Sequence, residues 1–114
     1  YLLWGQGVIQ DSIRHYEKAI ELDLYYDIAY NNLGVIYLDE LGNIEKAVEL
    51  FEKAIDINPN YALAYYNIGR SMMIKGDKIE AAKLFHESIE KNNYSNDLDV
   101  EEVKNRISKL FDSE

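Results

Sequence analysis

Cysteine is absent from this chain of 114 residues. Its absence excludes a disulfide framework, a thiolate metal site and a cysteine nucleophile, although it says little about compartment. Proline occurs once, at Pro59, so glycine and asparagine supply most of the signals that could end a helix. The sequence has no run of about eighteen apolar residues and no basic leader at its start. We therefore expect no signal peptide, no membrane insertion and a cytoplasmic location.

Positive charge is also scarce. The chain has 12 Lys and Arg residues against 21 Asp and Glu residues, which gives a formal net charge of −9. This field would repel DNA or RNA, and no basic stripe offsets it, so we expect no nucleic-acid partner. Hydrophobic residues make up 47% of the sequence and charged residues 29%, which is typical of a folded domain. The chain opens on Tyr1 without a methionine, so we expect a fragment of a longer chain.

The chain does contain an internal repeat. The segment YEKAIELD at 16–23 aligns with FEKAIDIN at 51–58, and AYNNLG recurs as AYYNIG at the same offset of 35 residues. Beyond Gly42 the period is 34, which places one extra residue between Tyr37 and Gly42. A period of this size predicts a protein built from repeated, similar supersecondary units.

Apolar residues inside each unit recur at helical spacing. A glycine followed by Asn43 or Asp77 separates the two apolar segments of a unit, and the Asn-Pro-Asn sequence around Pro59 closes the second unit. The second glycine of the repeat recurs as Gly7, Gly42 and Gly76, and the N-terminal YLLWGQ would be the tail of an earlier helix. The pattern predicts helices at 8–22, 28–41, 44–57, 62–75 and 78–91.

A further helix is predicted at 99–111, after the last repeat. Asp99 followed by Glu102 is typical of a capping box at a helix start. One side of the helix would be apolar, and Glu101, Glu102, Asn105 and Lys109 would face away from the packed side. A terminal repeat needs a polar outer face, so we expect this helix to cap the array. The apolar stripe consists of Val100, Val103, Ile107 and Leu110.

The repeated positions resemble the tetratricopeptide repeat family. The motif residues in the second unit are Tyr30, Leu33, Gly34, Tyr37, Gly42, Asn43, Ala47, Phe51, Ala54 and Pro59. The third unit departs from the motif at Met72, Ser88 and Asn93. The resemblance implies an all-α, right-handed solenoid of antiparallel helix pairs, about two and a half repeats long. One domain would span 1–114, divided into a partial repeat at 1–26, repeats at 27–61 and 62–95, and a capping helix at 96–114.

The resemblance also implies a non-catalytic function, the binding of a peptide or protein segment in a concave groove. In this family the first helix of each repeat lines the groove, and Trp4 would border it here. Asn32 and Asn67 recur in register and resemble the asparagine ladder of some peptide-holding members, since an amide both donates and accepts. The alternative is that asparagine is simply common at this position. The groove residues would be Ile28, Asn31, Asn32, Val35, Leu38, Asp39, Leu63, Tyr66, Asn67, Arg70, Met73 and Ile74.

The groove residues also indicate the chemistry of a ligand. Some members hold a chaperone's terminal carboxylate with cations, but the matching positions here carry Asn31, Leu63 and Asn67. Only Arg70 is basic among the groove residues, so we expect a neutral or basic segment with apolar anchors. The alternative is a structural spacer, or a self-association unit that forms a homo-oligomer through its N-terminal half repeat.

The stretch GRSMMIKGDK, from Gly69 to Lys78, raises the possibility of a phosphate-binding loop. Such a loop has four residues between its glycines and continues with Lys and Ser or Thr, whereas six intervene here and Asp77 follows the second glycine. We expect Gly69 to let paired helices approach closely, and Gly76 to end a helix in a left-handed conformation.

No other reactive set converges in the sequence. His15 and His86 each have a carboxylate four residues away but lack a third metal ligand. Ser12 and Ser88 stand where the repeat takes a small packed residue, so a nucleophile is not indicated. We therefore predict that the chain is not an enzyme and has no metal site and no cofactor.

Overall fold

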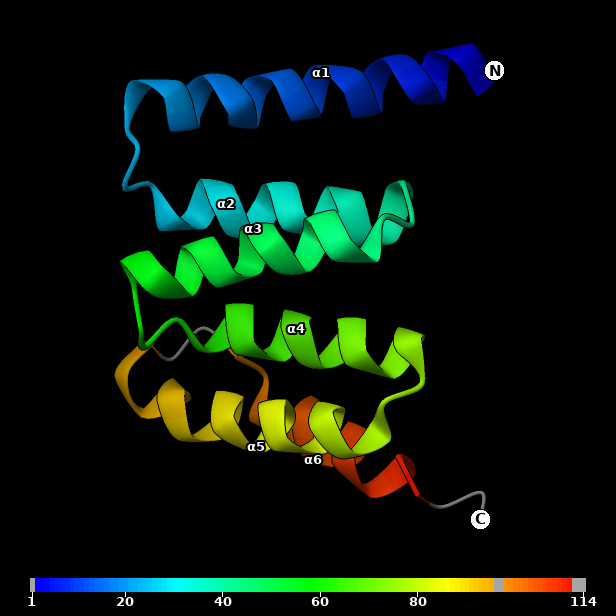
Figure 1. Ribbon diagram of the computed structural model, residues 1–114, viewed down its shortest axis with the longest axis vertical. Coiled ribbons are helices and arrows are strands. Elements are labelled where there is room, and N and C mark those ends of the chain that lie inside the picture. Colours follow the sequence, from blue (N-terminus) through cyan, green and yellow to red (C-terminus); the bar gives the residue numbers. More distant parts are fainter. Residues whose placement is uncertain (1, 96–97, 112–114) are drawn as a thin grey trace. The chain divides into compact units, whose positions relative to one another are not determined.

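The computed structural model describes residues 2–95 and 98–111, with side chains for residues 7–92 and 98–111. The described part is helical and divides into two compact units, Tyr1–Ile57 and Asn58–Glu114. Figure 1 shows that the helices within each repeat run in opposite directions and lie side by side. Unit 1 holds α1 (Leu2–Leu22), α2 (Asp27–Val35), the π-helical turn η1 (Ile36–Glu40) and α3 (Ile44–Ile57). Unit 2 holds α4 (Ala62–Lys75), α5 (Lys78–Ser95) and α6 (Val100–Lys109).

An aromatic ring packed on a glycine holds each helix pair together. Phe51 of α3 has no exposed surface, and a Cβ atom added to Gly34 of α2 would lie 2.6 Å from its ring. Phe85 of α5 is equally buried, and a Cβ atom added to Gly69 of α4 would also lie 2.6 Å from the ring. Both distances are far below carbon–carbon contact, so only glycine permits the observed approach. The predicted role of Gly69 is confirmed.

Two of the three equivalent turn glycines end helices as predicted. Gly42 and Gly76 adopt left-handed φ angles of 66° and 89°, which glycine tolerates best. The side chain that follows each glycine then caps the next helix. The Asn43 Oδ1 atom accepts from the Lys46 amide at 3.2 Å, and the Asp77 Oδ1 atom accepts from the Glu80 amide at 3.1 Å.

The predicted helix end at Gly7 is wrong, because α1 runs without interruption from Leu2 to Leu22. Gly7 is followed by Val8, which has no side-chain oxygen to cap a new helix as Asn43 and Asp77 do. Helical geometry therefore continues through the glycine, where an added Cβ atom would meet nothing within 4 Å. The fifth helix also differs from its prediction, since α5 extends to Ser95.

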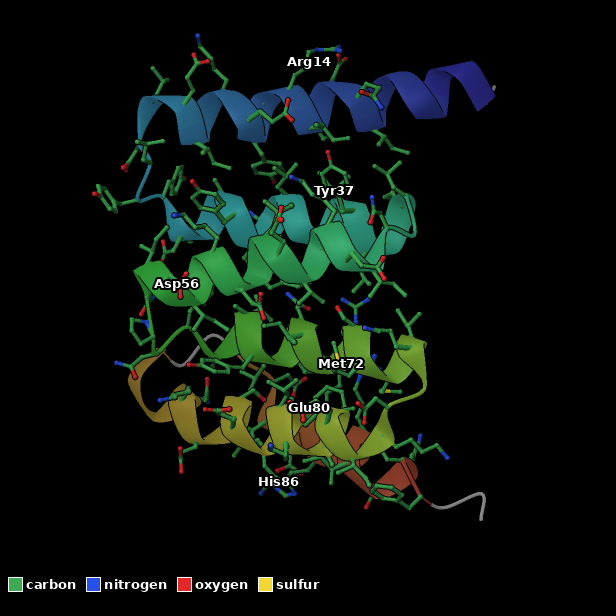
Figure 2. All side chains as sticks on the ribbon, viewed as in Figure 1. Arg14, Tyr37, Asp56, Met72, Glu80 and His86 are labelled. Carbon is green, nitrogen blue, oxygen red and sulfur yellow. The ribbon has the colours of Figure 1, made fainter. Side chains whose placement is uncertain are left out.

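The extra residue of the second repeat forms a π-helical turn. In η1 the Leu41 amide donates to the Ile36 carbonyl at 3.2 Å, which is a bond across five residues. At the equivalent end of α4, the Gly76 amide donates to the Met73 carbonyl at 3.0 Å and closes a normal C-terminal turn. The wider turn absorbs one residue without ending the helix. Tyr37 lies on η1, on the side that faces α1 (Figure 2).

The C-terminal helix α6 packs on α5 as a cap of unit 2. Val103 is 1% exposed and joins a core cluster with Tyr66, Phe85 and Leu110. The Asp99 Oδ1 atom accepts from the Glu102 amide at 3.2 Å, which is the predicted N-cap bond. The predicted outward direction of Glu102 needs correction, because its carboxylate accepts a hydrogen bond from Tyr66 of α4.

Asp99→Ala is expected to lower the free energy of unfolding by about 1 kcal/mol, since it removes the N-cap acceptor of α6. Urea denaturation followed by circular dichroism measures this loss. Asp99→Asn keeps a side-chain oxygen at the cap and is expected to remain within about 0.5 kcal/mol of the original chain. Equal losses in both variants would show that the charge, and not the cap bond, is responsible.

None of the helices in the described ranges is both long and apolar enough to cross a lipid bilayer.

Candidate binding surface of the first helices

The first helices of the two repeats are α2 with η1, and α4, and each carries a stripe of four predicted groove residues. The stripe residues recur at intervals of four, three and four positions, which places them on one helix face. The two stripes are related by the repeat offset of 35 residues. We call them the open stripes because seven of the eight members are exposed or half-buried; Asn67 is the buried member. They consist of Ile28, Asn32, Val35 and Asp39 in unit 1, and of Leu63, Asn67, Arg70 and Ile74 in unit 2.

The apolar members of the open stripes differ in exposure. Ile28 is 48% exposed and Ile74 is 58% exposed, so both present apolar surface to solvent. Val35 is half-buried. Leu63 packs partly against the core cluster of unit 2, which reduces the surface that it can offer. Apolar contact with a ligand is therefore available mainly at the two isoleucines and at Val35.

The remaining predicted groove residues lie on a second face of the same helices. Asn31 is 1% exposed, Leu38 is 4% exposed and Tyr66 is 8% exposed. Met73, on the same face as Tyr66, is 36% exposed. The prediction that the Tyr66 ring lines an open groove therefore needs correction, because α6 covers the ring. Sequence spacing placed these residues on the first helices, but it could not indicate which side another helix would cover.

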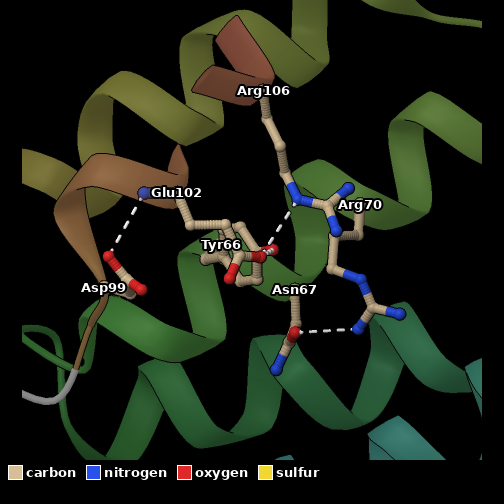
Figure 3. A network of polar contacts seen from close by, with 6 residues as sticks. All are labelled: Tyr66, Asn67, Arg70, Asp99, Glu102 and Arg106. Atoms are coloured by element: carbon tan, nitrogen blue, oxygen red, sulfur yellow. Dashed lines mark hydrogen bonds and ion pairs between the residues drawn. The ribbon is translucent and has the colours of Figure 1, made fainter. Parts of the chain in front are cut away.

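A polar network ties Tyr66 to α6 (Figure 3). The Tyr66 hydroxyl donates to the Glu102 Oε2 atom at 2.6 Å, and Arg106 Nε donates to the same atom at 3.3 Å. The Arg106 guanidinium lies 5.6 Å from the centre of the Tyr66 ring. Burial and the hydrogen bond to Glu102 raise the pKa of Tyr66 to about 12. The bonds from Tyr66 and Arg106 lower the pKa of Glu102.

Tyr66→Phe is expected to lower the free energy of unfolding by about 1–2 kcal/mol at neutral pH, because it deletes a bond to a charged acceptor. The pKa of Tyr66 is higher in the folded chain, so its contribution is fully present below pH 10 and declines as the pH rises towards 12. The pKa of Glu102 is lower in the folded chain, so its contribution is present above its unfolded pKa and declines in acid.

Urea unfolding of both chains between pH 4 and pH 11 measures this dependence. The difference in unfolding free energy between them is expected to be largest near neutrality and to narrow at either extreme. Tyr25→Phe is the matched control, since Tyr25 is 78% exposed and its loss should change stability little. A difference that stays constant over the whole pH range would contradict the assignment.

The two asparagines of the predicted ladder differ in their surroundings. Asn67 is 2% exposed, and its Oδ1 atom accepts from Arg70 Nη1 at 3.2 Å (Figure 3). Asn32 is half-buried and keeps part of its surface accessible. Asn67 thus orients Arg70 within the open stripe of α4, whereas Asn32 is the member of the pair that has more room for a ligand.

The other candidate residues lie apart from the open stripes. His15 and His86 are exposed, and Figure 2 shows His86 on the outer side of α5. Asp11 forms an ion pair with Arg14, which also points outward in Figure 2. Ser88 is buried and donates to the Phe85 carbonyl at 2.7 Å. The predicted packed position of Ser88 is confirmed.

Among the residues that the structure describes, no three His, Asp or Glu side chains gather in a way that could hold a metal ion. The side chain of Trp4, predicted to border the groove, lies outside the described residues.

The repeat register, the glycine–phenylalanine contacts and the left-handed turns are features shared with a known protein family. A profile described as "Tetratricopeptide repeat" matches residues 15–49, and one described as "TPR repeat" matches residues 40–76. A profile described as "Sel1 repeat" matches residues 1–24 and 60–93. The chain belongs to the tetratricopeptide repeat family. In the comparison with curated proteins, no match was found.

Solved structures of tetratricopeptide repeat proteins share the fold. A crystal structure of MamA is 35% identical with a TM-score of 0.71, over 83% of this chain and 55% of that one. The first such domain of Spaghetti (RPAP3), bound to the HSP90 peptide SRMEEVD, is 23% identical with a TM-score of 0.77, over 96% of this chain and 82% of that one. The Yersinia enterocolitica chaperone SycD, in complex with a peptide of the translocator YopD, is 16% identical with a TM-score of 0.76, over 96% of this chain and 82% of that one.

These comparisons confirm the fold class, an all-α tetratricopeptide repeat solenoid. The chain spans about half the length of the MamA chain that it matches. Membership of this family also supports the expectation that the chain is a protein–protein interaction module.

Proposed function

We propose that this chain binds a peptide or an extended protein segment along the open stripes and carries out no chemistry of its own. This proposal depends mainly on one observation: the same helix face occurs in both repeats and is accessible to solvent in both. The accessible residues run from Ile28 to Asp39 in unit 1 and from Arg70 to Ile74 in unit 2. A surface that repeats along the chain is suited to a ligand that is itself repetitive, such as a polypeptide backbone. Two structures of the same fold, those of RPAP3 and SycD, hold peptides, which supports this choice of ligand.

The ligand that suits unit 1 is neutral or basic and has apolar side chains. Residues 19–45 contain six acidic residues and no Lys or Arg, and this range includes the whole open stripe of α2 and η1. Ile28 and Val35 offer apolar contact on that stripe, and Asp39 is exposed at its end. The negative field would speed the association of a basic segment and oppose an acidic one.

Asn32 is the residue that we assign to the ligand's backbone. Its amide can donate to a carbonyl and accept from an N–H group at once, so it can hold a peptide without reading its side chains. Asn67 contributes through Arg70, to which it is bonded. Removal of one ligand hydrogen bond corresponds to about a tenfold loss of affinity.

A random dodecapeptide library displayed on phage tests the proposal. Peptides selected by the original chain are expected to carry basic and apolar residues, and to bind Asn32→Ala about tenfold more weakly. Ile28→Ala is expected to weaken binding as well. Ile79→Ala is the matched control, because Ile79 is 73% exposed on α5 and lies off the stripes. Equal binding of the selected peptides by the original chain, Asn32→Ala and Ile28→Ala would reject the open stripes as the site.

The second candidate function is self-association, favoured by apolar residues at the turn after α1. Leu22 is 77% exposed, Leu24 is 62% exposed and Tyr25 is 78% exposed. The positions one repeat later hold Ile57, Pro59 and Asn60, and none of them is a strongly exposed large apolar residue. Sedimentation of the original chain beside Leu24→Asn decides between the functions: a dimer lost only in the variant supports self-association, and a monomer in both excludes it.

A further inference from the structure

Unit 2 contains a pocket of about 580 Å³ at the junction of the end of α4, the start of α5 and one face of α6. This pocket is distinct from the open stripes, none of whose eight residues lines it. Among all the predicted groove residues it includes only Met73. Its main lining residues are Met73, Lys78, Glu102, Arg106, Lys109 and Leu110.

The charge of the pocket is opposite in sign to that of the whole chain. Three cationic side chains line it, those of Lys78, Arg106 and Lys109, against the single carboxylate of Glu102. That carboxylate already accepts from the Tyr66 hydroxyl and from Arg106 Nε. The chain as a whole carries a formal net charge of −9, so the pocket is a local site of positive charge on an acidic protein.

Arg106 is held in a fixed orientation within the pocket. Its Nε atom is bonded to Glu102, and its guanidinium lies over the Tyr66 ring. A planar guanidinium fixed in this way is well suited to a second carboxylate, since little side-chain entropy remains to be lost. Lys109 stands three residues further along α6, on the same helix face.

The pocket also has an apolar part. Met73 is 36% exposed, and Leu110, a buried member of the core cluster, also lines the pocket. A volume of about 580 Å³ falls within the range of about 300–1,000 Å³ typical of sites for organic ligands. A single inorganic anion would therefore leave most of the apolar surface uncovered.

We propose that this pocket binds a segment of a partner protein in which an acidic residue stands next to an apolar one. The acidic side chain is received by Arg106 and Lys109, and the apolar side chain packs on Met73. A nucleic acid or an anionic membrane is disfavoured, because the net charge of −9 repels a polyanion at long range whereas one or two carboxylates are drawn by the local cations. The inference rests on the proposed function in that the ligand is a polypeptide.

The test is a titration of the ¹⁵N-labelled chain, followed by amide chemical shifts. The probe is the hexapeptide acetyl-Ala-Leu-Glu-Leu-Glu-Ala-amide, and its control has glutamine at both glutamate positions. Saturable shifts are expected at the amides of residues 73–78 and 102–110, with the glutamine peptide weaker by about fivefold or more. Equal binding of both peptides, or shifts elsewhere only, would overturn the proposal.

Three variants distinguish binding in the pocket from a general effect of the protein's charge on peptide binding. Lys109→Gln is expected to weaken binding of the acidic peptide about three- to tenfold. Lys104→Gln, on the same helix but outside the pocket and paired with Glu101 at 3.8 Å, is expected to leave it unchanged. Glu102→Gln keeps an oxygen acceptor for Tyr66 but removes the competing charge, so it is expected to tighten binding. Equal effects of Lys109→Gln and Lys104→Gln, or weaker binding by Glu102→Gln, would contradict the assignment.

Two further controls identify the ligand. Inorganic phosphate and acetate are titrated alone, and shifts of the same amides at the same concentration as the peptide would reduce the pocket to a simple anion site. Sedimentation of the unliganded chain beside Lys109→Gln shows whether a second copy fills the pocket, and a dimer lost only in the variant would overturn the choice of a partner protein. Shifts confined to Ile28 and Asn32 would overturn this inference and leave the proposed function standing. Shifts confined to the pocket would support this inference, and the open stripes would still be tested separately by the peptides selected on phage.

Discussion

Phe85→Ala is expected to lower the free energy of unfolding by about 3–5 kcal/mol, the usual cost of deleting a fully buried aromatic ring. Phe85 has no exposed surface, and its ring contacts Gly69 of α4 and lies 5.5 Å, centre to centre, from the ring of Tyr66. It belongs to the cluster that also includes Val103 and Leu110 of α6. Deletion of the ring therefore loosens three helices at once and leaves a cavity that rigid helices cannot close.

Urea denaturation followed by far-ultraviolet circular dichroism measures this loss. Phe111→Ala is the matched control, because Phe111 is 48% exposed and its removal is expected to change stability by less than about 1 kcal/mol. A domain of ordinary stability has about 5–15 kcal/mol in total, so Phe85→Ala should lower the urea midpoint strongly. If the two variants shift the midpoint equally, the ring of Phe85 is not the centre of the unit 2 core.

Gly69→Ala is expected to destabilise the chain by about 1–3 kcal/mol, although alanine is the better helix former by about 1 kcal/mol. The added Cβ atom would lie 2.6 Å and 2.7 Å from two ring carbons of Phe85. The ring is fully buried, so it can move only if α4 and α5 separate. The overpacking cost therefore exceeds the gain in helix propensity.

Gly7→Ala tests the same substitution without the contact. Gly7 lies inside α1, and an added Cβ atom there would meet nothing within 4 Å. This variant is expected to gain about 0.5–1 kcal/mol from propensity alone. The double variant Gly69→Ala with Phe85→Leu should lose less stability than the sum of the two single changes, because the smaller side chain relieves the clash. Strict additivity would mean that the Gly69–Phe85 contact is not the cause.

Much of the fold followed from local signals in the sequence. The helices predicted at 44–57 and 62–75 coincide with α3 and α4, because glycine, asparagine and Pro59 mark their ends. The prediction failed at Gly7, where the sequence offered the glycine but Val8 instead of a capping residue. A break between two helices needs both a glycine that ends the first helix and a side chain that caps the second, so the repeated glycine alone was a misleading signal.

The candidate site was less predictable. The register of the repeats in the sequence indicated which helices come first in each repeat and which face carries Ile28, Asn32 and Ile74. That face is accessible to solvent. Register also selected Tyr66 and Leu38, which the structure buries. The pocket of α6 was missed, although Glu102, Arg106 and Lys109 recur at helical spacing in the sequence. That spacing could have shown a shared face, but not that the end of α4 lies opposite to it.

The amino-acid sequence by itself determined the repeat, the pairing of helices, and the positions where only glycine allows a phenylalanine ring to approach. These features depend on periodicity and on backbone preferences that act within a few residues. Only the tertiary structure decided which faces stay accessible, that α6 covers Tyr66, and that cations from α5 and α6 meet beside Met73. The physical reason is that burial and local charge depend on the neighbouring helix that packs against a residue, and Tyr66 and Glu102, which are in contact, lie 36 residues apart in the chain.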